Sequence, residues 1–128
     1  MRMTWLVALL LLPTTATAFT AQNGMTATRI GPTEIAVRHE VQRDDTDYWC
    51  AAGDFARRIL MLPGATRLWR ATPKPRRAGE GLVFTLDPAN KAEGAGLSSF
   101  GAGPRDGSIP IGMAAVNFCR VRRPEWLD

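Results

Sequence analysis

The first eighteen residues constrain what this chain can fold into more than any other feature, because they predict where it folds. Arg2 precedes the apolar run 6–12, and small residues close the segment at Ala16 and Ala18. This pattern is typical of a secretory signal peptide, and the run is shorter than the about 20 apolar residues that span a bilayer. We therefore predict cleavage after Ala18 and a periplasmic or secreted mature protein, residues 19–128, without a membrane span.

The two cysteines, Cys50 and Cys119, are the next constraint. Removal of the leader leaves 110 residues, a common size for a single domain. An even number of cysteines in a small domain of an oxidising compartment predicts a disulfide, and we expect this one to be structural. The alternative is a redox protein or enzyme: the positive end of a helix would favour a Cys50 thiolate, and His39 could serve as its base.

Hydrophobic periodicity predicts an α+β fold, with one main helix packed on a small, largely antiparallel sheet. The helix begins near Tyr48, after aspartates that can cap it, and ends before Pro63 and Gly64. Residues 19–28 are small and polar and predict a poorly ordered arm. Residues 87–110 predict a long glycine-containing loop. The predicted strands are residues 34–41, 66–72, 81–86 and 111–121.

Cys50 does not fit a simple one-sided helix. At about 100° per residue it falls opposite the middle of the helix's apolar stripe. Either the first turn is irregular or a second layer covers that side of the helix. In both cases the disulfide would join the start of the helix to the predicted last strand near Cys119.

The basic residues predict a binding surface. The net charge is +4, or +3 without the leader, and fourteen of the sixteen basic residues are arginine. Arg67 and Trp69 alternate onto one face of a predicted strand, and Arg76 and Arg77 lie in the loop that follows. These four residues would bind an envelope protein or another anionic surface. Nucleic acid is not expected as the partner of an exported protein. The alternative is a solvated basic edge that protects the sheet from self-pairing.

The remaining reactive residues argue against common catalytic and metal sites. His39 is the only histidine, which leaves zinc and most acid–base schemes without enough groups, and we interpret it as a hydrogen-bonded packing residue. A calcium loop starting at Asp45 would need glycine and glutamate where Cys50 and Ala56 stand. The serines of residues 96–101 do not match a G-x-S-x-G motif. No cofactor or metal is expected.

Three segments carry a resemblance. Residues 48–54 (YWCAAGD), 84–87 (FTLD) and 118–119 (FC) together resemble short exported hypothetical proteins of Gram-negative proteobacteria. The resemblance implies a periplasmic location and a paired-cysteine framework, and it assigns no site residue. We therefore expect a non-enzymatic exported accessory or binding protein. The alternatives are the thiol-based protein described above and a secreted inhibitor that acts through loop 87–110.

Overall fold

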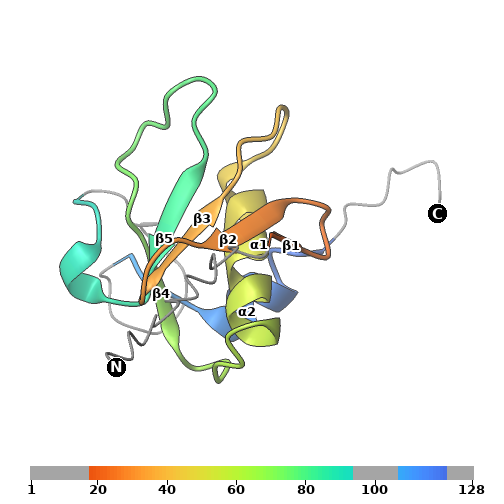
Figure 1. Cartoon of the computed structure of the whole chain (residues 1–128), viewed down its shortest axis with the longest axis vertical. Coiled ribbons are helices and arrows are strands. Elements are labelled where there is room, and N and C mark those ends of the chain that lie inside the picture. The colour runs from red at the N-terminus through yellow and green to blue at the C-terminus, as the bar shows by residue number, and fades with distance from the viewer. Residues whose placement is uncertain (1–17, 94–106, 121–128) are drawn as a thin grey trace, which may run out of the picture.

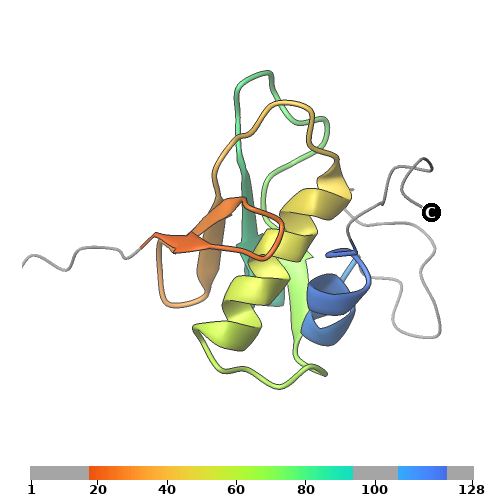
Figure 2. The same ribbon diagram turned by 90° about the vertical axis from the view of Figure 1, so that its right-hand side faces the viewer.

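The computed structural model describes residues 18–93 and 107–120 and has an α+β fold. Helix α1 and a short helix α2 pack on a six-stranded antiparallel sheet (Figures 1 and 2). The predicted fold class is therefore confirmed. Nearly all of the predicted leader and the middle of the predicted loop 87–110 lie outside the described residues. Within them, no helix has the length and apolar character needed to cross a membrane.

The sheet has the strand order β1-β2-β3-β5-β4-β6, and all of its neighbours are antiparallel. Its central strands match three predicted strands, with shorter bounds. Ile35 of β3 lies opposite Phe84 of β5, and Trp69 of β4 lies opposite Thr85. The strands are β1 Phe19–Thr20, β2 Thr26–Arg29, β3 Glu34–Val37, β4 Arg67–Arg70, β5 Leu82–Thr85 and β6 Ile109–Pro110.

The N-terminal segment forms a β-hairpin, so the expectation of a poorly ordered arm over residues 19–28 is wrong. Gly24 has φ 85°, a left-handed conformation that glycine adopts readily, and it lies in the turn between β1 and β2. The Asn23 side chain accepts a hydrogen bond from the Met25 N–H at 3.1 Å. Because Met25 and Ala27 are fully buried, the hairpin is part of the core rather than an appendage.

Helix α1, Asp45–Arg58, confirms the predicted main helix with earlier ends. Asp44 precedes it, and the Asp47 carboxylate accepts a hydrogen bond from the Asp44 N–H at 3.0 Å, an arrangement that satisfies one of the free N–H groups near the start of a helix. The helix ends at Arg58, before Pro63, and Met61 then adopts φ 56°. The aspartates therefore start the helix as the sequence predicted.

The C-terminal segment is helical, so the predicted last strand over residues 111–121 is wrong. The short strand β6 pairs with β4 just before this segment, and α2, Ile111–Val116, follows at once. The physical reason is close packing between helices. A Cβ added to Gly53 of α1 would lie 2.6 Å from the Ala114 Cβ. Small residues on both helices therefore let α2 pack directly on α1, which a strand at this position would not do.

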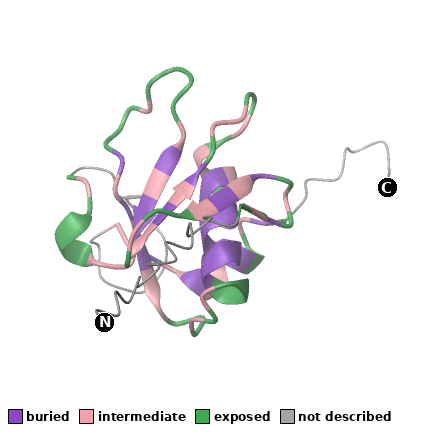
Figure 3. Ribbon diagram, in the orientation of Figure 1, coloured by how far each residue is buried: buried purple, intermediate pink, exposed green. Residues whose placement is uncertain are grey.

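The core lies between the sheet and α1. Trp49 packs on Phe84 with ring centroids 4.6 Å apart. All residues from Tyr48 to Ala56 of α1 are buried, because the sheet covers one side of the helix and α2 covers another (Figures 2 and 3). This second layer resolves the position of Cys50, which faces α2 rather than solvent.

Candidate functional site

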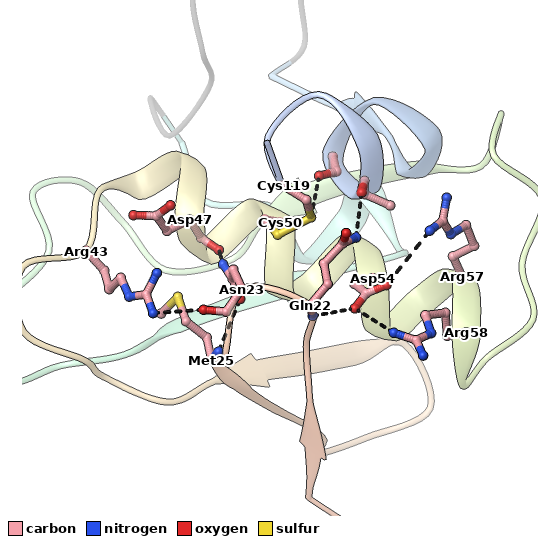
Figure 4. The surroundings of a disulfide bond; sticks show 12 residues. Gln22, Asn23, Met25, Arg43, Asp47, Cys50, Asp54, Arg57, Arg58 and Cys119 are labelled. Atoms are coloured by element: carbon pink, nitrogen blue, oxygen red, sulfur yellow. Dashed lines mark hydrogen bonds and ion pairs between the residues drawn. A yellow bond between two sulfur atoms is a disulfide. The ribbon is translucent and has the colours of Figure 1, made fainter. Parts of the chain in front are cut away.

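The two cysteines form the predicted disulfide. Cys50 of α1 and Cys119, which follows α2, are joined across 69 residues with their Cα atoms 4.9 Å apart (Figure 4). Cys50 is fully buried and Cys119 is 8 % exposed. The bond joins α1 to the segment after α2, not to a strand as expected. In this state neither sulfur is available as a thiol nucleophile, so no observation favours the redox alternative.

A buried carboxylate lies beside the disulfide, on α1. Asp54 is fully buried, and its Oδ2 accepts a hydrogen bond from the Gln22 N–H at 2.9 Å. The Gln22 side-chain amide donates in turn to the Ala115 carbonyl at 2.8 Å (Figure 4). Arg58 lies 3.5 Å and Arg57 4.0 Å from the same carboxylate. Because a buried charge needs partners, these contacts indicate that Asp54 fixes the N-terminal hairpin to both helices.

The predicted binding residues Arg67 and Trp69 lie on the sheet face that points away from α1. They alternate with Leu68 and Arg70, which are buried toward the helix, as the sequence predicted. The Arg67 guanidinium donates hydrogen bonds to the side chain and the carbonyl of Ser108. Both residues are half-buried, and the described contacts of Arg67 position β6 rather than present a free cation.

Arg76 and Arg77 lie elsewhere, in the loop between β4 and β5. The Arg76 guanidinium stacks on the ring of Tyr48, with its carbon 4.4 Å from the ring centroid. Arg77 is exposed, and only its backbone N–H bonds to the Glu80 carboxylate, at 3.3 Å. The structure therefore does not bring the four predicted residues together. Arg76 packs against Tyr48 at the start of α1, and Arg77 is exposed.

His39 is a hydrogen-bonded packing residue, as we interpreted it, although it lies beyond the end of β3. Its Nδ1 is 3.5 Å from the Tyr48 hydroxyl, and the residue is half-buried. Among residues 18–93 and 107–120 no group of three or more His, Cys, Asp or Glu side chains could hold a metal ion. The aspartates at the start of α1 are instead used within the fold, and Asp45 pairs with Arg70 at 2.9 Å.

A hollow of about 670 Å³ lies on the outer face of the sheet, next to the β4–β5 loop. Its floor is formed by small side chains on three neighbouring strands, Thr28, Ala36 and Val83, which lie opposite one another in the register. Arg38 and Glu80 also line it. The small residue types at Thr28, Ala36 and Val83 could have indicated this floor from the sequence. Only the strand order shows that the three residues are neighbours.

One charge pattern was overlooked in the sequence. Residues 55–79 contain seven Arg or Lys residues and no Asp or Glu. The structure distributes these cations over three environments. Arg57 and Arg58 lie at the end of α1, Arg67 and Arg70 lie on β4, where Arg70 is buried against Asp45, and the β4–β5 loop holds the last three.

Comparison with known proteins gave no match. No family model, no curated protein and no solved structure is similar to this chain at the level that marks a relative. The resemblance to exported hypothetical proteins stays a prediction, and the function has to be argued from the chain's own residues.

Proposed function

We propose that this chain is a non-enzymatic exported binding protein that holds an anionic partner at one end of its sheet. We define the basic end as Arg38, Lys74, Arg76 and Arg77, which lie on the two loops that follow β3 and β4. The loops are neighbours, because a Cβ on Gly81 would lie 3.1 Å from the His39 N atom. The disulfide and the hydrogen bond of His39 support a structural role for the most reactive side chains.

The proposal rests mainly on the exposure of two arginines at this end. Arg38 and Arg77 are exposed, and neither makes an ion pair within residues 18–93 and 107–120. By contrast, Arg70 and Arg43 are each paired with a carboxylate at 2.9 Å. Exposed guanidinium groups that are not held in an intramolecular ion pair can bind carboxylates or phosphates of a partner in a bidentate manner.

The hollow on the outer sheet face supports the same surface. Arg38 lines it, and its floor of small side chains would admit a flat or extended ligand. Glu80 is the acidic member of the lining. An anionic partner that enters the hollow would therefore meet Arg38 in its lining and small, neutral side chains on its floor.

The proposal is tested with a labelled polyglutamate peptide as the anionic probe. We expect Arg77→Ala and Arg38→Ala each to weaken its binding by roughly three- to tenfold, with the loss shrinking at high salt, as expected of a screened charge contact. Lys91→Ala is the matched control. It removes an exposed cation at the opposite end of β5, and its binding should stay close to that of the wild type.

Two results would contradict the proposal. One is equal binding by the wild type and Arg77→Ala. The other is an equal loss in Arg77→Ala and Lys91→Ala, because binding would then follow net charge rather than a defined surface.

A further inference from the structure

A second surface, at the C-terminal end of α1, combines exposed apolar side chains with cations. Ile59 is 51 % exposed and Met61 is 79 % exposed, directly after the last turn of α1. Large apolar side chains displayed together commonly mark an interaction surface.

The backbone holds the Met61 side chain in this position. Met61 has φ 56°, a left-handed conformation that glycine or asparagine adopts more easily than methionine. The segment is fixed on both sides, because the Leu60 N–H donates to the Phe55 carbonyl at 3.2 Å and the Leu62 N–H to the Ala56 carbonyl at 3.1 Å. The fold thus keeps a strained methionine whose side chain contributes little to the core.

The charges around this tip are positive. The side chains of Arg57 and Arg58 are 42 % and 54 % exposed, and the carboxylate near them, Asp54, is fully buried. Two guanidinium groups therefore share one inward carboxylate and leave an excess of positive charge at the surface. No acidic residue follows until Glu80.

From this juxtaposition we infer that the C-terminal end of α1 docks on an anionic lipid bilayer. Ile59 and Met61 enter the headgroup region, and Arg57 and Arg58 extend to lipid phosphates while their aliphatic stems stay among apolar groups. This surface is separate from the basic end and goes beyond the proposed function.

The exposure and composition of the tip favour a bilayer over a protein partner. The segment follows a helix end, and Pro63, Gly64 and Ala65 beside it are exposed. Its apolar members are aliphatic, whereas the energetic centres of protein interfaces are enriched in Trp, Tyr and Arg held in pockets. A soft headgroup layer accepts such an exposed tip without shape complementarity.

The test measures cosedimentation with phosphatidylglycerol–phosphatidylcholine vesicles, using the protein as recovered from an exporting host. We expect binding that falls with salt and is much weaker to phosphatidylcholine alone. Met61→Asn should weaken binding by about tenfold, because it removes one inserted apolar side chain. Asparagine suits the left-handed backbone, so the variant should melt at the same temperature as the wild type or higher. Val41→Asn is the matched control, since Val41 is 74 % exposed in the loop between β3 and α1.

Several results would overturn the inference: no binding to the mixed vesicles, equal binding by Met61→Asn, or an equal loss in Val41→Asn. A Met61→Asn variant that loses polyglutamate binding instead would assign the tip to an acidic protein. The two proposals fail separately, because Arg77→Ala is read with the peptide and Met61→Asn with vesicles.

Discussion

At the N-terminal end of α1 the charged side chains are held by contacts within the protein, whereas at the C-terminal end Arg57 and Arg58 lie near the buried Asp54 and still remain exposed. Asp47 closes the first turn, Asp45 pairs with Arg70, and Tyr48 carries the Arg76 guanidinium. At the other end Arg57 and Arg58 are exposed and are followed by exposed apolar residues. Helix α1 therefore stabilises the fold through contacts at its N-terminal end and leaves side chains exposed at its C-terminal end. A basic residue contributes to packing at the first end and is accessible to a partner at the second.

The largest effect should come from the disulfide, which holds the anchored half of α1. Replacing both cysteines, Cys50→Ala with Cys119→Ala, removes a link across 69 residues. The chain-entropy model then predicts a loss of about 4 kcal/mol in the free energy of unfolding. Urea denaturation measures it. A midpoint equal to that of the wild type would show that the helix layer is held without this bond.

A smaller loss is expected where α2 packs on α1. Gly53→Ala raises intrinsic helix propensity by about 1 kcal/mol, but its Cβ would lie 2.6 Å from the Ala114 Cβ and 3.0 Å from the Ala115 N atom. We expect a net loss of about 1–3 kcal/mol in the free energy of unfolding, measured by the same denaturation.

Gly64→Ala is the control for this contact. Its Cβ would meet its nearest neighbour, the Gly112 Cα, at 3.5 Å, an ordinary van der Waals contact. The change should stay within about 0.5 kcal/mol. Equal effects of the two substitutions would contradict the close packing that replaces the predicted last strand.

The smallest effect concerns pH. The hydrogen bond from the Thr33 hydroxyl to Glu34, at 2.8 Å, holds the pKa of Glu34 below its ordinary value of 4.5, and the Asn90 amide acts in the same direction. A lowered pKa in the folded state stabilises the fold at pH values above the unfolded pKa, and this contribution is lost as the pH falls through the folded value.

The corresponding experiment compares the wild type with Glu34→Gln during acid titration. The wild type should lose slightly more stability than the variant between about pH 5 and pH 3. Because Glu34 is solvent-accessible, the difference should be close to the precision of thermal melts. A larger acid sensitivity in the variant would reverse the sign argued here.

The parts of the fold that could be predicted are those whose sequence signals lie within one short segment. The helix α1 was predictable because its periodicity and capping aspartates lie within one segment, and the disulfide because only two cysteines exist. Helix α2 was not, because Met113, Ala115 and Cys119 alternate as a strand would, and its close packing on Gly53 joins residues far apart in the sequence. The N-terminal hairpin was missed because its buried residues are mostly small.

The candidate site was less predictable than the fold. Strand alternation placed Arg67 and Trp69 on one face correctly. It could not show that Arg76 stacks on Tyr48 or that Arg67 binds Ser108, because these contacts join residues far apart in the chain. Composition likewise gives the number of basic residues without showing which of them form ion pairs or packing contacts within the fold.

The central claim is that the fold uses some of its arginines internally and leaves others exposed for a partner. The measurement that tests it most directly compares a buried arginine with an exposed one. Arg70 is 1 % exposed and paired, and Arg77 is exposed. We predict that Arg70→Met lowers the free energy of unfolding by about 2 kcal/mol and leaves polyglutamate binding unchanged, while Arg77→Ala weakens binding and leaves stability unchanged. The opposite pattern, or one effect shared by both variants, would contradict the account.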